Sequence, residues 1–414
     1  MSSRDGQRIA VIGAGPAGIM AGLEASAAGA QTTLYDTNAA VGRKLLVTGN
    51  GRCNISHVGA RASDYVCDQP KALAAILARC GHPEVLARLA DAGVLTYATA
   101  DGWCYPLSDS AVTVVEALSA ALRLAQVELR LQTQVRDLAI DRQGWSVIAG
   151  SPDSPHRYER VVVATGGKAH PALGSTGQFF TILQRLGHRI LSIHPALVSI
   201  EADMRRLHTL QGVRLDARLS LYTGDTCLGS DVGNVMFTQS GLSGPAAMNL
   251  SHLVHTEPRG SLTAVIDLLA LHEESLRSLL RDKRREPWPL TALLGAVLPA
   301  KLPVLLLLLA GLPPDALLNE LNEDRLEALL ATARTLTVRV TGTRDYAFAQ
   351  LSSGGVPLEE VDPDDMASRV APGLHLAGEV LNVIGPCGGY NLLFAQASGM
   401  LAGRGASRGA GRAT

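Results

Sequence analysis

The sequence offers little that would mark a metal site, a membrane segment or a nucleic-acid surface. Its six cysteines include no C-x-x-C pair, so we expect no metal and no redox dithiol, and scattered thiols suit a reducing cytoplasm. The 37 basic and 38 acidic residues nearly balance, so charge favours neither nucleic acid nor an anionic membrane as a partner. The longest apolar stretch, residues 302–312, is shorter than the ~20 residues that span a bilayer.

These absences favour small-molecule partners, and no feature indicates an obligate protein partner. With 414 residues, of which 47% are hydrophobic, the chain predicts two or three globular domains. Polar residues 1–8 lead directly into an apolar strand, which leaves no room for a signal peptide and predicts a cytoplasmic protein. The apolar stretch at 302–312 predicts a buried helix, with an interfacial or partner-binding helix as the alternative.

A glycine-rich turn after the first predicted strand, residues 9–12, is the most informative motif. Gly13 permits a tight turn, Gly15 lets the backbone approach a pyrophosphate, and Gly18 lets the next helix pack closely on its strand. Pro16 suits the first helical turn, and the helix N-terminus favours negative charge. A purely structural glycine turn is the alternative to a dinucleotide site.

A second strand in register with this motif favours the dinucleotide site. The helix is expected over residues 16–28 and the strand over 32–35, and Asp36 follows the strand directly. An acid at that position accepts both hydroxyls of an adenosine ribose. Strand, turn, helix, strand and acid therefore occur in the order that a dinucleotide-binding unit requires.

The predicted fold class is α/β, with a Rossmann-like dinucleotide-binding domain interrupted by an insert that has a β-rich and a helical part. Alternating strands and helices occupy residues 1–188, which we expect to be the first segment of that domain. The insert is expected at 189–344, β-rich and antiparallel over 189–268 and helical over 269–334. The second segment is expected at 345–403, and 404–414 as a solvated, disordered tail.

Three glycine turns each follow a predicted parallel strand and should meet at the carboxyl edge of one sheet, where ligands bind. They are Gly13 to Gly18, the turn Ala164, Thr165, Gly166 and Gly167, and the pair Gly378 and Glu379. A C-terminal turn of the Leu-Ala-Gly-acid type, far along the chain from the first turn, is typical of FAD-binding folds. FAD is an extended ligand, so it needs this additional contact segment. The helix after Gly389 would then direct its N-terminus at the flavin's pyrimidine edge, where a positive end stabilises the anionic reduced flavin.

Residues 41–54, VGRKLLVTGNGRCN, resemble the G-R-K-L-x-x-T-G-x-G-R-C-N motif of BaiN-like flavoproteins, an NAD(P)/FAD-dependent oxidoreductase family that includes BaiN and RdsA. The resemblance spans nearly the whole chain. It continues in segments 164–167, 170–171, 174–177, 241–245, 354–356 and 385–391. It implies an FAD domain with a two-part insert, as expected above.

The resemblance also implies residues that hold the cofactor, each carried over by position. Gly13, Gly15, Ala17, Gly18 and Asp36 would hold the ADP half, with Arg43 and Lys44 by its ribose or phosphates. The isoalloxazine would be approached by Arg52, Cys53 and Asn54, and adenine by the backbone of Val135. The ribityl chain and ring would be closed in by Gly378, Glu379, Gly388, Gly389, Tyr390, Asn391 and Leu392.

The sequence departs from the family pattern at three places. Asp36 stands where flavoproteins usually carry Glu, Gln178 and Phe179 replace part of a Gly-Asp-Gly turn, and Pro386 with Cys387 replaces a Thr. These changes favour a different substrate preference, so no family member's substrate is carried over.

The sequence does not identify a catalytic acid. Tyr390 and His194 are candidate proton donors, and Cys53 is a candidate flavin-side nucleophile, although packing or capping is the more common role of such residues. Trp103 and Tyr105 either line a substrate pocket or pack in the core.

The resemblance implies an FAD-dependent oxidoreductase that passes hydride from flavin to a small acceptor such as a conjugated enone. NADPH or NADH would bind only transiently, because no second G-x-G-x-x-G motif is present. A flavin-dependent tRNA-modifying protein is one alternative, and it would require a basic face such as residues 277–285. A flavin-binding regulator without turnover is the other.

Overall fold

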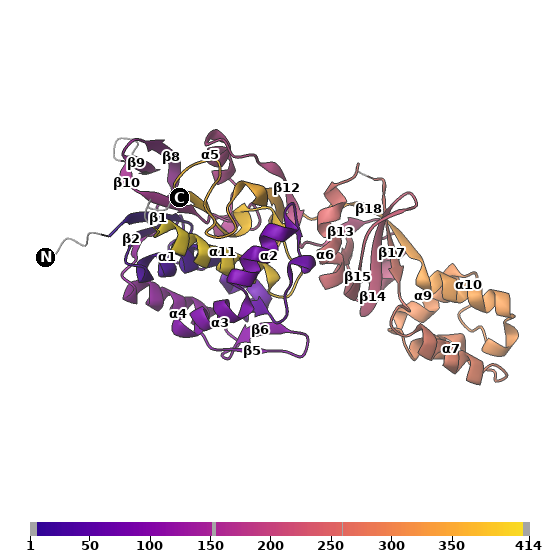
Figure 1. The fold of residues 1–414 in the computed structure, drawn as a ribbon. Coiled ribbons are helices and arrows are strands. Elements are labelled where there is room, and N and C mark those ends of the chain that lie inside the picture. The colour runs from indigo at the N-terminus through magenta and orange to yellow at the C-terminus, as the bar shows by residue number, and fades with distance from the viewer. Residues whose placement is uncertain (1–5, 151–154, 259, 409–414) are drawn as a thin grey trace. The chain divides into compact units, whose positions relative to one another are not determined.

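The computed structural model describes residues 6–150, 155–258 and 260–408, which divide into two compact units. The first unit comprises Met1–His194 and Leu351–Thr414, and the second is Pro195–Gln350 (Figure 1). These boundaries lie six residues after the expected 188/189 and 344/345. Each unit buries a hydrophobic cluster of its own, so each has the core that an independent domain requires.

The first unit is built on a five-stranded sheet in the order β20-β11-β1-β2-β7. All of its strand pairs are parallel. The strands are β1 (Arg8–Ile12), β2 (Gln31–Tyr35), β7 (Glu128–Arg130), β11 (Arg160–Val163) and β20 (Leu374–Leu376). Because β20, β11 and β1 are neighbours, their carboxyl ends lie side by side. The prediction that the three glycine turns meet at one sheet edge is therefore confirmed.

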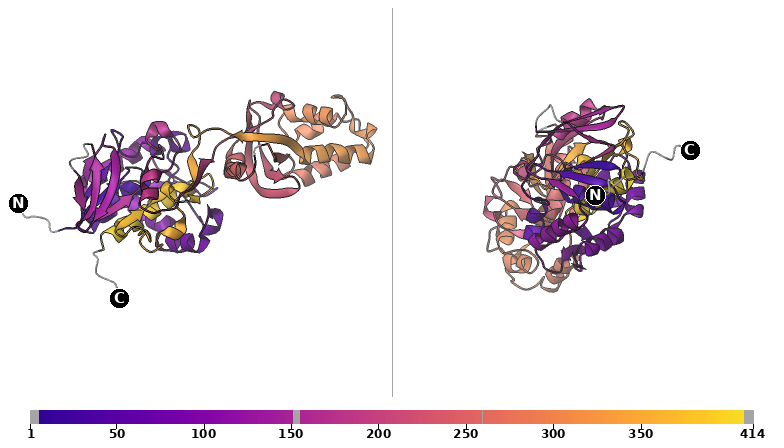
Figure 2. Two further views of the ribbon diagram at one scale, coloured as in Figure 1. Left: turned by 90° about the horizontal axis from the view of Figure 1, so that it is seen from above. Right: turned by 90° about the vertical axis from the view of Figure 1, so that its left-hand side faces the viewer.

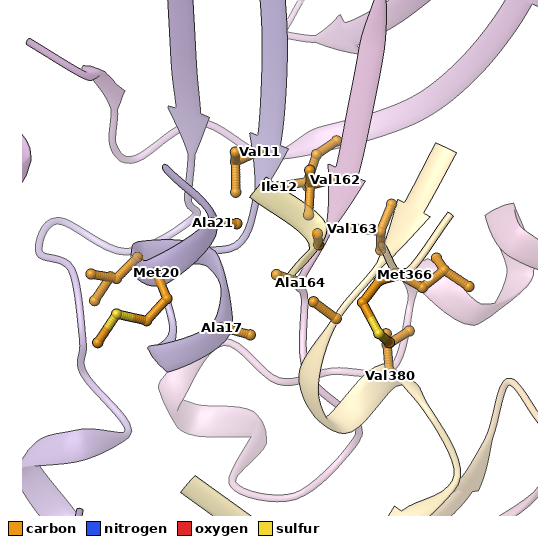
Figure 3. Close-up of a cluster of buried hydrophobic side chains, with 14 of the residues drawn as sticks. Val11, Ile12, Ala17, Met20, Ala21, Val162, Val163, Ala164, Met366 and Val380 are labelled. Atoms are coloured by element: carbon orange, nitrogen blue, oxygen red, sulfur yellow. The ribbon is translucent and has the colours of Figure 1, made fainter. Parts of the chain in front are cut away.

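Small residues let two helices pack closely on this sheet. A Cβ on Gly399 or Gly403 of α11 (Tyr390–Ala406) would lie 2.2 or 2.3 Å from a backbone oxygen of α1 (Pro16–Ala27). Figure 3 shows Ala17 and Ala21 of α1 among the buried side chains of β1 and β11.

The expected tail at 404–414 is wrong at its start. Helix α11 continues to Ala406, and the Arg404 guanidinium donates to Glu24 of α1 at 2.6 Å. The repeated Gly and Ala residues that suggested a solvated end are the small residues that close helix contact requires. Residues 409–414 lie outside the described part of the chain.

Smaller elements surround the sheet. The helices are α2 (Pro70–Arg79), α3 (His82–Asp91), α4 (Ala111–Leu124) and α5 (Phe179–Arg185). One three-stranded sheet contains β8 (Val135–Asp141), β9 (Gly144–Ala149) and β10 (His156–Tyr158), and another contains β3 (Ser56–His57), β5 (Thr96–Ala98) and β6 (Trp103–Pro106). Two-stranded ribbons pair β4 (Val66–Cys67) with β21 (Val383–Ile384), and β12 (Leu191–Ala196) with β19 (Leu351–Gly355).

The antiparallel strands of the second unit close into a barrel in the order β13-β16-β15-β14-β17-β18. Its strands are β13 (Ile200–Ala202), β14 (Arg214–Thr223), β15 (Thr226–Phe237), β16 (Gly241–Ser243), β17 (Leu262–Asp267) and β18 (Leu336–Thr343). Strand β15 contains Gly229 and Gly233, which interrupt its alternation of apolar and polar residues, and pairing with β14 along its length supplies its hydrogen bonds.

Helices gather at one end of this barrel (Figures 1 and 2). They are α7 (Glu273–Asp282), α8 (Leu290–Gly295), α9 (Lys301–Leu309) and α10 (Glu323–Arg334), and α6 (Pro245–Leu250) packs on the strands. Helix α9 contains most of the Leu-rich stretch and buries Leu302, Leu306 and Leu307, as expected. No helix in the described part of the chain has the length and apolarity needed to cross a membrane.

Candidate functional site

The turn after β1 combines two crowded glycines with one open glycine. Gly13 has φ of +102°, and a Cβ there would lie 2.4 Å from the Ala164 oxygen. A Cβ on Gly18 would lie 1.8 Å from the Gly13 oxygen, so the fold itself requires both glycines. A Cβ on Gly15 would meet no heavy atom of the described residues within 4 Å. Gly15 therefore leaves space at the N-terminus of α1, where Pro16 is the first helical residue and an anion is favoured.

Asp36, at the end of β2, also organises the surrounding loops. Its carboxylate accepts from the Ala14 N–H at 2.7 Å and from the backbone and side-chain nitrogens of Asn38 at 2.7 and 2.8 Å. Oδ1 accepts both Asn38 bonds, whereas Oδ2 accepts the Ala14 N–H and keeps a second lone pair for a ribose hydroxyl. The Arg43 guanidinium donates to Asn38 Oδ1 at 2.8 Å, so Arg43 lies at this end of the site. Sequence reasoning missed Asn38, although an Asp-x-Asn segment is typical of a local side-chain turn.

Lys44 lies in a different network from Arg43. Its ammonium contacts a Glu379 oxygen at 2.5 Å, with both side chains about one-fifth exposed. The other Glu379 oxygen accepts from the Ser352 N–H at 2.9 Å and from the Ser352 hydroxyl at 3.1 Å. A Cβ on Gly167 would lie 2.0 Å from Ser352 Oγ, so this network borders the second glycine turn. Ser352 was not predicted, because nothing in its neighbouring sequence indicates contact with Glu379.

Thr165, in the second glycine turn, has an unsatisfied hydroxyl. Its Oγ1 is buried and has no hydrogen-bond partner within the described residues. Its Cα would lie 3.0 Å from a Cβ on Gly13, and Gly166 beside it has φ of +73°. A buried hydroxyl without a partner costs free energy, and a polar ligand would remove that cost. The orphaned hydroxyl beside the open space at Gly15 therefore fits an extended dinucleotide.

Gly378, at the end of β20, lies close to α1. A Cβ on Gly378 would lie 2.9 Å from the Ala17 Cβ, and the Gly378 N–H donates to Ser398 Oγ at 3.0 Å. This contact brings the third glycine turn next to the first helix. Buried Ala164 ends β11 between them, and its N–H donates to the Ile12 oxygen at 2.8 Å.

The loop before α11 is held rigidly by glycine contacts and by Asn391. A Cβ on Gly388 would lie 2.9 Å from Trp103 Nε1, and one on Gly389 would lie 2.3 Å from the Ser56 oxygen. The Asn391 amide accepts from the Gly385 N–H at 2.7 Å and donates to the Gly385 oxygen at 2.8 Å. The N-terminus of α11 therefore has a fixed position. Trp103 packs against this loop, whereas Tyr105 is buried in the unit.

The segment 52–54 supports the loop from within the first unit. The Arg52 guanidinium lies 4.3 Å from the centre of the Tyr105 ring. Cys53 is fully buried, and burial raises the pKa of its thiol to about 11. The Asn54 amide, with its nitrogen facing the carbonyls, donates to the Cys104 and Ser56 oxygens at 3.1 Å. The surroundings of Cys53 are those of a packing residue, because a nucleophilic thiol needs a lowered pKa and access.

The remaining predicted residues lie on separate elements. Buried Val135 begins β8, and half-buried Leu392 is the third residue of α11. His194 lies on β12, its carbonyl accepts from Ser353 Oγ at 3.3 Å, and burial lowers the pKa of its ring. The Tyr390 ring stacks on His57 at 4.3 Å, a contact that sequence reasoning missed because β3 and α11 are far apart in the chain.

Comparison with known proteins agrees with this geometry. Residues 7–405 match the model of the HI0933-like protein Rossmann domain family. A 3-dehydro-bile acid delta(4,6)-reductase of Clostridium scindens is 33% identical over 407 residues, which cover 97% of this chain and 99% of the relative. A ribosomal RNA dihydrouridine synthase of Escherichia coli is 29% identical over 393 residues, covering 94% of this chain and 95% of the relative.

A solved structure supports the fold across the whole chain. A 3-ketosteroid-delta4-(5alpha)-dehydrogenase from Rhodococcus jostii RHA1, in complex with 4-androstene-3,17-dione, superposes with a TM-score of 0.50. The match covers 99% of this chain and 98% of that one. Because the two chains are only 17% identical, the match supports the fold alone. The chain belongs to the HI0933-like Rossmann family and is a BaiN-like, FAD-dependent oxidoreductase.

Proposed function

We propose that this protein reduces a carbon–carbon double bond conjugated to a carbonyl in a small organic acceptor, using FAD that NADPH or NADH reduces. The observation that carries the proposal is the shared chemistry of its full-length relatives. A 3-dehydro bile acid with unsaturation at position 4 is a conjugated enone. The double bond that is saturated in dihydrouridine is likewise conjugated to a ring carbonyl. Both names therefore describe addition of hydride and proton to a polarised double bond.

The residues of the candidate site suit that cofactor. Bound FAD would supply hydride transfer at its ring. The N-terminus of α1 at Gly15 would hold the pyrophosphate, and Asp36 would accept from the ribose. Thr165 would gain the hydrogen-bond partner that it lacks, and the α11 N-terminus would favour negative charge on the ring.

RNA is a second acceptor class, favoured by the ribosomal RNA dihydrouridine synthases of E. coli and Haemophilus influenzae. The basic stretch at 277–285 gives this candidate little support. The guanidinium of Arg277 bonds to both Glu273 and Glu327, and Arg281 and Lys283 pair with Glu274 and Glu286. Cations already neutralised by carboxylates attract phosphate weakly. The flavin-binding regulator without turnover has no specific observation in its favour.

Single-turnover reoxidation tests the acceptor class. Enzyme reduced with NADPH under anaerobic conditions is mixed with 2-cyclohexen-1-one, with a 4-en-3-one steroid, or with a uridine-containing RNA at two salt concentrations. We expect either enone to restore the oxidised flavin spectrum and to yield the saturated ketone. Reoxidation by RNA alone, weakened by salt, would replace the small acceptor with RNA. Reoxidation by neither would contradict the proposal.

A further inference from the structure

Two aromatic side chains lie in contact at the N-terminus of α11. The His57 ring, on β3, stacks on the Tyr390 ring with centres 4.3 Å apart and planes 24° apart. The Tyr390 hydroxyl lies 3.4 Å from His57 Nε2. This distance is long for a hydrogen bond, and in a near-parallel stack the oxygen lies over the face of the imidazole rather than in the plane of its nitrogens.

The backbone fixes the orientation and the tautomer of His57. His57 Nε2 lies 3.1 Å from the Asp101 carbonyl oxygen. Because a carbonyl only accepts, Nε2 must carry the hydrogen, and Nδ1 of the neutral ring is then a bare lone pair. Nδ1 is in fact buried without a partner within the described residues. Gly102 has φ of +84°, and a Cβ there would lie 2.8 Å from His57 Cε1, so the covering turn leaves the ring no room to shift.

In this tautomer the Nε2–H points in the ring plane to the Asp101 carbonyl, whereas the Tyr390 ring is stacked over the face of the imidazole. Nε2 then has no lone pair to accept the Tyr390 hydrogen, so the Tyr390 O–H remains available to another group. His57 orients the phenol by stacking on its ring.

The pair borders the loop that we expect beside the flavin ring. Tyr390 directly follows Gly388 and Gly389, whose α-carbons lie against Trp103 and Ser56. The Tyr65 ring packs edge-on against Tyr390 at 5.7 Å, and its hydroxyl donates to the Tyr390 carbonyl at 2.9 Å. Burial, with a smaller effect of Asp64, raises the pKa of Tyr390, so the phenol keeps its proton until an acceptor takes it.

We propose that Tyr390 donates the proton that completes reduction of the acceptor, and that His57 is its positioning residue; this inference rests on the proposed function. Hydride adds to the double-bond carbon remote from the carbonyl, and the π electrons move onto the carbon beside the carbonyl. The Tyr390 O–H bond breaks, and its proton bonds to that second carbon. The phenolate regains a proton from water. Two electrons and two hydrogens are thereby accounted for, with NAD(P)H as the reductant.

Two electron acceptors separate proton donation from the rest of turnover. Reduction of 2-cyclohexen-1-one requires a proton donor, whereas reduction of ferricyanide by the same reduced enzyme does not. We expect Tyr390→Phe to lower kcat for the enone by roughly 100-fold, the usual scale of general acid catalysis, with KM and the ferricyanide rate little changed. We expect His57→Ala, which removes the stacked ring, to lose less, and His57→Phe, which restores an aromatic ring, to recover part of that loss. Tyr97→Phe, at a half-buried tyrosine whose hydroxyl donates to Asp109, is the matched control.

A second readout does not depend on turnover. In flavin-free protein labelled with ¹⁵N-histidine, the His57 signals should show a protonated Nε2 and an unprotonated Nδ1. They should shift in Tyr390→Phe and stay unchanged in Tyr97→Phe. FAD affinity, measured by quenching of flavin fluorescence, should be similar in all variants.

The outcomes distinguish this inference from the function on which it rests. Enone reduction by Tyr390→Phe at close to the wild-type rate would overturn the inference alone, and so would a hydrogen on Nδ1. Wild-type enzyme that reduces ferricyanide but no enone would overturn the proposed acceptor class, and the inference with it. If Tyr390→Phe fails to bind FAD, the histidine tautomer of the wild-type protein and the recovery of activity in His57→Phe relative to His57→Ala decide the question.

Discussion

At the scale of single residues, Cys53 shows how surroundings decide between two interpretations of one side chain. The family motif puts this thiol close to the flavin, but the structure buries it completely at a positive φ of 64°. Burial disfavours the thiolate, which is the reactive form. Cys53 therefore contributes volume to the core rather than electrons to the reaction.

Thiol labelling of the native protein at pH 8 tests this assignment. The pKa of Cys53 is raised to about 11 and that of Cys80 to about 12, so both stay protonated at this pH and should react slowly. Cys227 is exposed and should react fast. Mass spectrometry of iodoacetamide-treated protein should find label at Cys227 first, and Cys227→Ser should remove that fast phase. Fast labelling at Cys53 before unfolding would contradict a packing role.

The sequence allowed prediction of the residues whose function follows from local geometry. Gly13, Gly15 and Gly18 are identified by their spacing, because a tight turn and a close helix each exclude a side chain. Ser352 and His57 were missed, because their importance comes from contacts with Glu379 and Tyr390, which lie far away along the chain. Spacing rules describe neighbours in sequence and contain no information about such partners.

At the scale of elements, the turn between β1 and α1 contains a matched pair of substitutions. A Cβ on Gly18 would strike the Gly13 oxygen at 1.8 Å, so Gly18→Ala should destabilise the fold by about 3 kcal/mol or more. A Cβ on Gly15 would enter open space at an ordinary φ of −77°, so Gly15→Ala should preserve stability. The added methyl would occupy the expected pyrophosphate position, and FAD affinity should fall by about tenfold or more.

Thermal unfolding of both variants without FAD, followed by fluorescence titration with FAD, measures the two effects separately. If Gly15→Ala binds FAD as tightly as the wild type, the pyrophosphate does not bind at this turn. If Gly18→Ala has the melting temperature of the wild type, α1 can move away from β1 to make room for the methyl group.

Elements with a strong local pattern were predicted well, and elements defined by distant contacts were not. The strand and helix around the first glycine turn match the expected ranges to within a residue. Helix α11 extends beyond its expected end because its small residues pack on α1. Helix propensity, which ranks glycine as unfavourable, does not include the gain from such packing. Closure of the second unit into a barrel depends on β13 pairing with β18, strands more than one hundred residues apart.

At the scale of the molecule, the chain leaves the first unit after His194 and returns to it at Leu351, and these two points are adjacent within the first unit. Ser353 Oγ donates to the His194 carbonyl at 3.3 Å, and β12 pairs with β19 there. Replacing residues 195–350 with a short Gly-Ser linker should therefore leave a folded first unit that still binds FAD, because domain insertions at adjacent chain ends are tolerated. Circular dichroism and FAD titration, with the full chain as control, would check this. A product that aggregates or binds no FAD would show that the first unit depends on the insert.

The visible absorption spectrum of the purified full chain, recorded anaerobically before and after NADPH and then NADH, tests the central claim most directly. An FAD-dependent reductase should show the bands of oxidised flavin, and at least one nucleotide should bleach them. Protein that binds no flavin after incubation with FAD would contradict the account at its foundation. Bound flavin that neither nucleotide reduces would contradict the proposed electron donor.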